Sequence, residues 1–217
     1  MKEKVVTGII NGISLQFIDL ENSVTVPCVF EELGQNIYGL EDVVLTEDDV
    51  VIDIGANVGM FSIYVKKKFN CEVISFEPIP INFEHFKQNI ILNGLKLEDF
   101  SLHNSAVSSK DGDFLILGVP YGNTGGSSIL HKNLPLSFSC PTETIDKYIT
   151  DKCKYLKIDC EGGEYDIIPS ILEKLNAFEY IGIEYHVYQD QFTVKDIANL
   201  DTLIRKNFNG KLFHNNF

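Results

Sequence analysis

The sequence predicts an α/β fold: a doubly wound, mostly parallel, Rossmann-like sheet with an N-terminal antiparallel β-hairpin extension. Short continuous apolar runs alternate with amphipathic segments along the chain, which is typical of a parallel sheet with helices on both faces. Asn11-Gly12 separates two alternating apolar runs, which predicts the hairpin because both turn positions need a positive φ. We therefore expect a hairpin region over residues 1–45 and a core domain over residues 46–217.

The remaining elements follow from the apolar runs in order. We expect a third antiparallel strand at 24–30, with Pro27 at an edge or a bulge. Beyond it the pattern predicts strands at 50–54, 72–77, 101–107, 113–119, 155–160, 180–186 and 211–214, and helices at 58–69, 80–93, 144–150, 164–175 and 194–207. The Gly/Ser-rich residues 121–128 could form a lid over an acceptor or a plain connection.

The composition predicts a globular protein of the cytoplasm. The chain has 217 residues, 44% hydrophobic and 23% charged, which suits one domain and excludes a disordered or disulfide-scaffold class. The five cysteines form no CxxC pair, as expected for reduced thiols. Residues 1–20 lack the apolar core of a signal peptide, and we expect no transmembrane segment.

The charge argues against a nucleic-acid partner. Eighteen Lys and Arg residues against 31 Asp and Glu residues give a net charge of −13, and Arg205 is the only arginine. Nucleic-acid binding depends on Lys and Arg side chains that neutralise phosphates. We therefore expect no nucleic acid as a partner, while a homo-oligomer stays open.

The first chemical signal is DIGANVG at residues 53–59, between a predicted strand and a predicted helix. Glycines let the backbone approach a ligand, and a helix N-terminus offers free N–H groups to an anion. The dinucleotide fingerprint would need glycine at 57 and 60, where the chain has Asn57 and Met60. Asp53 would repel a pyrophosphate but suits the ammonium of an amino-acid tail. The segment therefore favours S-adenosylmethionine, and the alternative is a turn that merely needs glycine.

Glu77 is the second signal, because it ends the next strand 22 positions after Gly55. A carboxylate at this point can accept both ribose hydroxyls of an adenosine. Glu77 also precedes a helix, so N-terminal capping is the alternative. We favour the ribose interpretation.

Acidic residues and a histidine gather at the ends of two later strands. Asp159 and Glu161 follow one strand, and Glu184 and His186 end the next. Ligands bind outside such strand ends in open α/β sheets. We predict that His186 is the general base, oriented by Glu184 or Asp159. We assign no metal ligands, although Asp159, Glu161 and Glu184 could instead hold Mg²⁺. We interpret Glu164 as a helix cap.

Seven motifs together resemble the FkbM-type methyltransferases. They are DIGANVG at 53–59, FEP at 76–78, NSAVS at 104–108, GGS at 125–127, ETIDKY at 143–148, LKIDCEGGEYDII at 156–168 and IEYH at 183–186. The resemblance covers roughly residues 38–186, and its specific part is the pairing of the first motif with the sixth. It implies a class I sheet with strand order 3-2-1-4-5 and an antiparallel C-terminal pair. Only one convincing strand follows His186, so we expect that pair to be incomplete.

The resemblance also implies a function and a set of site residues. It implies S-adenosylmethionine-dependent methylation of a hydroxyl on a sugar, glycolipid or small metabolite, so the partner is a small-molecule or glycan acceptor. The expected cofactor-binding residues are Asp53, Gly55, Asn57, Gly59, Glu77, Asn104, Ala106 and Asp159, and the expected catalytic residues are His186, Asp159 and Glu184. The alternatives are a non-catalytic nucleotide-binding module with a degenerate methyltransferase fold and an NAD-dependent oxidoreductase. The missing dinucleotide fingerprint argues against the second.

Overall fold

A six-stranded sheet forms the centre of the computed structural model, which describes residues 2–21, 23–119, 126, 128, 136–187 and 191–214. The strand order is β11-β10-β9-β3-β4-β5, and each neighbouring pair is parallel. The strands are β3 (Val50–Ile54), β4 (Glu72–Phe76), β5 (Phe100–His103), β9 (Cys153–Ile158), β10 (Tyr180–Ile183) and β11 (Lys211–His214). The predicted order 3-2-1-4-5 is confirmed. The antiparallel C-terminal pair is absent from the described residues, because β11 runs parallel to β10.

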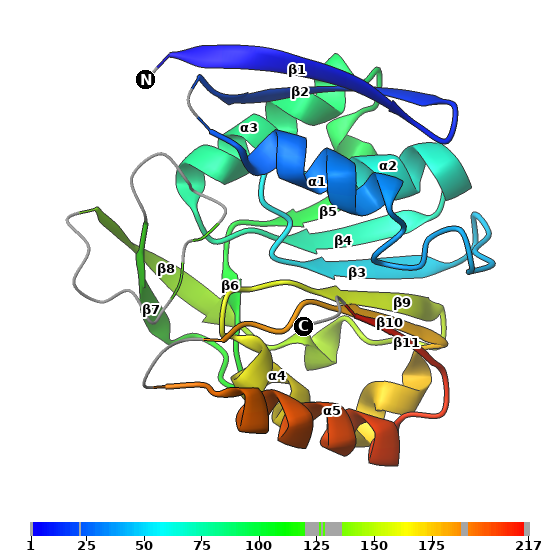
Figure 1. Cartoon of the computed structure of the whole chain (residues 1–217), viewed down its shortest axis with the longest axis vertical. Coiled ribbons are helices and arrows are strands. Elements are labelled where there is room, and N and C mark those ends of the chain that lie inside the picture. Colours follow the sequence, from blue (N-terminus) through cyan, green and yellow to red (C-terminus); the bar gives the residue numbers. More distant parts are fainter. Residues whose placement is uncertain are drawn as a thin grey trace.

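Helices cover both faces of this sheet (Figure 1). Helices α2 (Met60–Phe69) and α3 (Pro80–Leu92) share one hydrophobic core with Val51, Val73 and Tyr155 of the strands. Helices α4 (Glu164–Ser170) and α5 (Val194–Asn207) share a second core with Ile52 and Ile54. Neighbouring residues of β3 thus point into different cores, which confirms the doubly wound architecture. The helix predicted at 164–175 is divided into α4 and the 3₁₀ helix η3 (Leu172–Ala177).

The N-terminal hairpin forms a separate two-stranded sheet above the helices (Figure 1). Strands β1 (Glu3–Ile10) and β2 (Ile13–Leu20) pair in antiparallel register around Asn11 and Gly12, whose φ angles are 47° and 82°. The side chain of Asn89 on α3 accepts the N–H of Ile18 at 2.7 Å. The hairpin therefore covers the helical layer and does not extend the central sheet.

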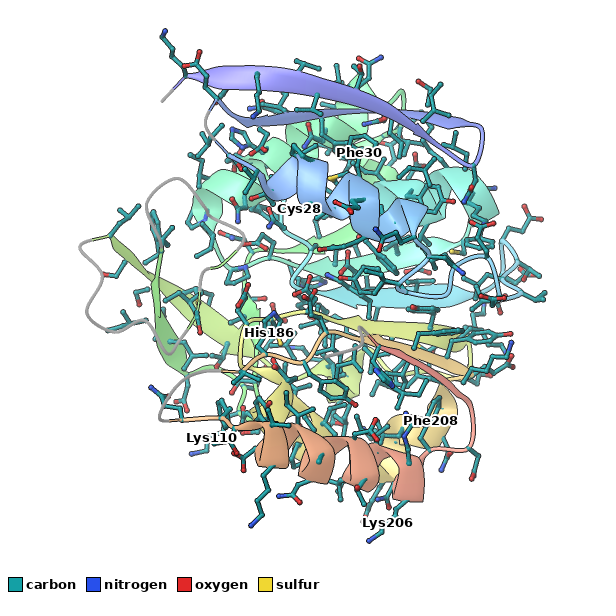
Figure 2. All side chains as sticks on the ribbon, in the orientation of Figure 1. Cys28, Phe30, Lys110, His186, Lys206 and Phe208 are labelled. Carbon is teal, nitrogen blue, oxygen red and sulfur yellow. The ribbon has the colours of Figure 1, made fainter. Side chains whose placement is uncertain are left out.

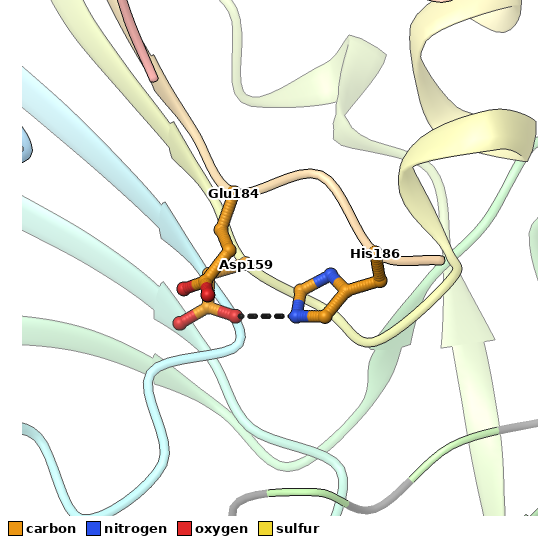
Figure 3. A group of neighbouring side chains, drawn as sticks. All are labelled: Asp159, Glu184 and His186. Carbon is orange, nitrogen blue, oxygen red and sulfur yellow. Dashed lines mark ion pairs between the residues drawn. The ribbon is translucent and has the colours of Figure 1, made fainter. Parts of the chain in front are cut away.

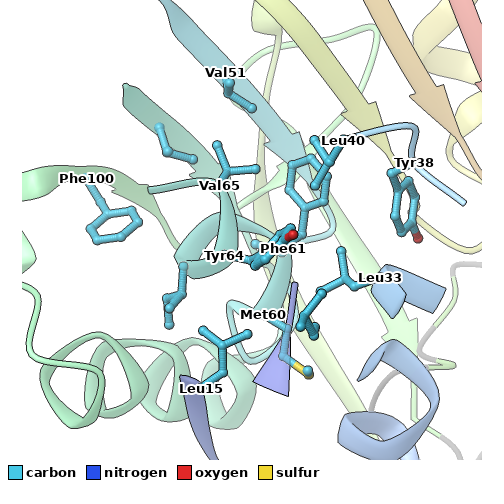
Figure 4. Close-up of a cluster of buried hydrophobic side chains, with 14 of the residues drawn as sticks. Leu15, Leu33, Tyr38, Leu40, Val51, Met60, Phe61, Tyr64, Val65 and Phe100 are labelled. Carbon is cyan, nitrogen blue, oxygen red and sulfur yellow. The ribbon is translucent and has the colours of Figure 1, made fainter. Parts of the chain in front are cut away.

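Residues 24–30 are not the predicted strand; most of them belong to helix α1 (Thr25–Gly34). The β-branched residues around Pro27 favoured a strand, but proline is tolerated in the first helical turn, where its missing N–H is not needed. Val26 and Leu33 recur at helical spacing, and both are buried in the core that α1 shares with β2 and α2 (Figure 4). Tertiary packing of this apolar face decides in favour of the helix.

A small three-stranded sheet stands beside the carboxyl ends of the central strands (Figure 1). It consists of β6 (Ala106–Val107), β7 (Phe114–Gly118) and β8 (Ser137–Glu143), and β8 pairs with both of the others. The prediction of a single strand at 101–107 is wrong, because β5 ends at His103 and β6 belongs to this second sheet. The 3₁₀ helices η1 (Leu97–Asp99) and η2 (Ile145–Lys147) complete the described elements, and η2 replaces the short helix predicted at 144–150. The predicted lid or connection at 121–128 lies outside the described residues except for positions 126 and 128.

Among the described residues, no helix has both the length and the apolar character that a membrane crossing requires.

Candidate active site

The loop after β3 and the turn after β9 pack directly against each other. Gly55 has a φ of 78°, and a Cβ at this position would lie 1.7 Å from the carbonyl oxygen of Asp159. Only glycine fits this contact. The buried Lys157 joins the same segments, because its Nζ donates to the Gly55 carbonyl oxygen at 2.9 Å and lies 3.2 Å from Asp53 and 3.3 Å from Asp159. The first and sixth motifs of the sequence therefore form one site.

A pocket opens at this junction, at the carboxyl ends of β3 and β4. Five of the predicted cofactor-binding residues line it: Gly55, Asn57, Glu77, Ala106 and Asp159. Its apolar walls are Ile54, Phe76, Ile79, Val107, Leu115 and Leu117. An apolar slot with a few convergent polar groups is typical of a small-molecule site, and this one has the shape and chemistry for a purine nucleoside.

Glu77 is buried in the pocket wall, where its carboxylate fixes the surrounding loops. It accepts the backbone N–H groups of Asn57 at 2.7 Å and Ile79 at 2.8 Å. Burial raises the pKa of Glu77 to about 7, although these hydrogen bonds act in the opposite direction. Asn57 Oδ1 is buried without a hydrogen-bond partner among the described residues. A ligand with hydroxyl or amino donors would satisfy both residues, so the pocket fits the adenosine part of S-adenosylmethionine.

The other three predicted cofactor residues support the pocket from outside its lining. The carboxylate of Asp53 is fully buried and faces Lys157. Gly59 starts α2 with a φ of 87°. The side-chain amide of Asn104 donates to the carbonyl oxygen of Glu77 at 2.8 Å. Each of them holds a loop that carries lining residues.

His186 lies beside the pocket together with Asp159 and Glu184 (Figure 3). Its Nε2 is 3.8 Å from Asp159 Oδ1 and 3.5 Å from Glu161 Oε2, and both of these acids line the pocket. On the other side of the ring, Nδ1 lies 3.3 Å from Glu164 Oε1, which also accepts the His186 backbone N–H at 2.9 Å. Glu164 therefore holds the imidazole, and its other oxygen accepts the N–H of Gly162 at 2.9 Å in the turn before α4, so the carboxylate also acts at the helix N-terminus where the sequence placed it.

The acids around His186 stabilise its charged form. Burial by itself lowers the pKa of His186, but the hydrogen bond to Glu164 and the charges of Asp159 and Glu161 outweigh burial and raise the pKa to about 10. Burial and the charge of Asp159 raise the pKa of Glu184 to about 7. At neutral pH the ring of His186 thus carries a proton, and Glu184 binds its proton more tightly than an ordinary glutamate.

Helix α1 and the turn that follows it add two residues that the sequence analysis missed. The Tyr38 hydroxyl donates to Asp159 Oδ2 and Glu184 Oε2, each at 3.4 Å. Glu32 is half-buried, and burial together with the charge of Asp159 raises its pKa to about 7. Neither residue has a local sequence signal, because both reach the site through the packing of α1. Lys157 was also missed, although a lysine within a buried strand signals a buried acidic partner.

A second, smaller pocket continues from the first toward α1. Thr25, Val29 and Tyr38 line it on the N-terminal side. Gly55, Asn57 and Asp159 line both pockets. The two pockets therefore adjoin each other at these three residues. In Figure 2 the site lies near the middle of the view, where His186 is labelled between α1 and α5.

Asp159, Glu184 and His186 each place one ligand atom within 4.8 Å of the other two, a spacing that a metal ion could use. Two cationic groups already face these carboxylates, however. Lys157 Nζ lies 3.3 Å from Asp159, and His186 Nε2 lies 3.8 Å from Asp159 and 3.5 Å from Glu161, so these carboxylates already face nitrogen atoms of the protein itself.

Known proteins with similar sequences include methyltransferases. The family model for the methyltransferase FkbM domain matches residues 53–209 of the sequence. Methyltransferase 1 of Beauveria bassiana is 27% identical over 147 residues, which cover 56% of this chain and 58% of that protein. The hexuronic acid methyltransferase AglP of Haloferax volcanii is 24% identical over 155 residues, which cover 71% of this chain and 62% of that protein. The chain thus spans less than two thirds of the length of each relative.

Similar solved structures include the following two proteins. TYW2 of M. jannaschii in complex with AdoMet has a TM-score of 0.45 and 15% identity, and the match covers 95% of this chain and 74% of that chain. The precorrin-6y C5,15-methyltransferase of Geobacter metallireducens has a TM-score of 0.40 and 14% identity, covering 77% and 66%.

Proposed function

The chain belongs to the FkbM methyltransferase family, and from this premise we propose that it transfers a methyl group from S-adenosylmethionine to a hydroxyl group. One observation carries the proposal: the pocket that contains Asn57 and Glu77 also contains Asp159 and Glu161, which face His186. We infer that Glu77, in the pocket, would bind the ribose. His186, beside the pocket, would accept the proton of the acceptor hydroxyl.

Several residues would hold the cofactor. Glu77 would accept hydrogen bonds from the ribose hydroxyls, and Asn57 Oδ1 would gain the partner that it lacks. Ala106 and the apolar walls would enclose the purine, and the second pocket would take the amino-acid tail. When bound, the cofactor supplies a methyl group already activated by its sulfonium. The protein then needs to align the acceptor and exclude water, which contributes several kcal/mol (about 7–11 in the most favourable cases).

The acceptor side of the site would be built around His186. In molecules whose His186 ring has lost its own proton, the proton of the acceptor hydroxyl would pass to Nε2, the ring nitrogen that faces Asp159 and Glu161, while Glu164 holds Nδ1. The carboxylates of Asp159, Glu161 and Glu184 can accept hydrogen bonds from further hydroxyls, which supports a sugar, a glycolipid or a hydroxylated small metabolite as the acceptor. The name of the Haloferax relative, a hexuronic acid methyltransferase, also supports a sugar.

Calorimetric titration with S-adenosylmethionine, S-adenosylhomocysteine and NAD⁺ tests the cofactor. We expect micromolar binding of the first two compounds and none of NAD⁺. Glu77→Gln should weaken binding of both adenosyl compounds about 10- to 100-fold. The two carboxylate oxygens of Glu77 accept two backbone N–H groups, and in glutamine an NH₂ group, which is itself a donor, would face one of them.

Glu84→Gln is the matched control, because Glu84 is an exposed carboxylate on the neighbouring helix α3 and pairs with Lys87. It should leave both affinities unchanged. If folded wild-type protein bound neither adenosyl compound, the cofactor assignment would be wrong, and the degenerate binding module would become the better description.

Removal of divalent metal ions should leave the protein functional. Because Lys157 and the protonated His186 already neutralise the carboxylates, we expect S-adenosylmethionine binding and methyl transfer to survive dialysis against EDTA. The measurement is the dissociation constant and the transfer rate before dialysis, after dialysis and after addition of Mg²⁺. Loss of transfer that Mg²⁺ restores would contradict this arrangement and favour a metal held by Asp159 and Glu184.

A further inference from the structure

Helix α1 brings a carboxylate to the site from outside the segment that matches the family model. That match begins at residue 53, whereas Glu32 lies on α1. Thr25 and Val29 of the same helix line the second pocket. Glu32 follows Val29 by three positions and therefore lies on the same face of the helix, one turn further along. It is half-buried there, within electrostatic reach of Asp159, Lys157 and His186.

The charges around Glu32 leave its carboxylate without a full counter-charge. Lys157 lies between Asp53 and Asp159, so one ammonium already faces two carboxylates. His186 lies among Asp159, Glu161 and Glu164. On α1 itself, the neighbouring Glu31 adds a further negative charge. An ionised Glu32 therefore increases an existing excess of negative charge around Asp159, which lines both pockets.

Resting on the proposed function, we propose that Glu32 is a specificity-determining residue that makes the site prefer S-adenosylmethionine to its product, S-adenosylhomocysteine, which lacks the sulfonium charge. The two compounds share the adenosine and the amino-acid tail. They differ by the methyl group and by the positive charge of the sulfonium. A carboxylate within electrostatic reach of Asp159, which lines both pockets, attracts the sulfonium that only S-adenosylmethionine carries, whereas its attraction for the tail ammonium is common to both compounds. Because methyl transfer removes that charge, the same residue would also favour product release.

The test compares the dissociation constants of the two compounds in wild-type protein, Glu32→Gln and Glu31→Gln. Glu32→Gln should lower the preference for S-adenosylmethionine about three- to tenfold, because it removes a charge but keeps the shape of the side chain. Glu31→Gln is the matched control, since Glu31 precedes Glu32 on the helix but is exposed and accepts a hydrogen bond from Gln35. The preference of Glu31→Gln should differ from that of wild type far less than the preference of Glu32→Gln does, because the charge of Glu31 lies in solvent and is screened.

A pH series gives an independent reading of the same charge. Burial and Asp159 raise the pKa of Glu32 to about 7, so its carboxylate loses its charge as the pH falls through this value. The preference of wild-type protein for S-adenosylmethionine should therefore increase as the pH rises through 7. Glu184 titrates in the same range, so Glu32→Gln should reduce this increase without abolishing it.

The outcomes separate this proposal from the function on which it rests. If wild-type protein binds neither compound, the proposed function fails. If Glu32→Gln weakens both compounds equally or changes neither affinity, the proposed function stands and the role of Glu32 is wrong. Glu32→Ala serves as a second variant should the glutamine variant not fold, and an unchanged preference in it would overturn the role equally.

Discussion

Replacing Lys157 by methionine is expected to lower the free energy of unfolding by about 3–5 kcal/mol. Lys157 and Asp53 are both buried on adjacent strands of the central sheet, 3.2 Å apart. Burial lowers the pKa of Lys157, but the charges of Asp53 and Asp159 outweigh it and hold the pKa above its usual value. The substitution leaves Asp53 in the core without its counter-ion, and a lone buried charge costs far more than the pair contributes.

Chemical denaturation of matched variants measures this cost. Lys154→Met is the control, because Lys154 pairs with Glu179 at the surface, and its loss should change stability little. In Asp53→Asn/Lys157→Met both charges are removed, so the double variant should be more stable than Lys157→Met alone. A Lys157→Met protein as stable as wild type would show that Asp53 does not depend on the lysine.

The sheet and the hairpin could be predicted because their signals are local. Buried parallel strands appear as continuous apolar runs, and Asn11-Gly12 meets the φ requirement of its turn. Helix α1 could not be predicted in the same way. The β-branched residues around Pro27 favour a strand locally, whereas burial of Val26 and Leu33 against β2 and α2 favours a helix. The outcome depends on contacts that only the folded chain makes.

The core of the candidate site was predictable for a topological reason. The carboxyl ends of parallel strands meet at one edge of a sheet, so Glu77, Asp159 and Glu184 had to lie near one another. Glu32 and Tyr38 could not be found in this way, because they come from a helix whose place is set by packing. Only one of the two roles of Glu164 could be predicted for a related reason: its position in the first turn of α4 indicates the contact with Gly162, whereas its hold on His186 depends on the fold.

Replacing His186 by alanine is expected to lower the turnover of methyl transfer by about two to four orders of magnitude, while the dissociation constant of S-adenosylmethionine changes little. Nε2 faces the acids of the acceptor side, and the ring is held from its other side by Glu164. The imidazole of His186 takes the proton from the hydroxyl of the methyl acceptor during the transfer itself, after the cofactor has bound. Its loss therefore affects the chemical step far more than binding.

The raised pKa of His186 makes this role testable by pH. The base must be unprotonated, and the surrounding acids raise its pKa to about 10, so turnover should increase with pH over the alkaline range up to that value. Initial rates of labelled methyl transfer, measured across pH on any acceptor found in a panel of glycans and hydroxylated metabolites, test this. His186→Ala should lose the increase. His214→Ala, on β11 beside Arg205, should keep it.

If wild-type turnover instead decreased as the pH rose toward 10, the charged imidazolium would be the active form. His186 would then act by holding the carboxylates of Asp159 and Glu161 in place, and one of the acids would have to take the proton.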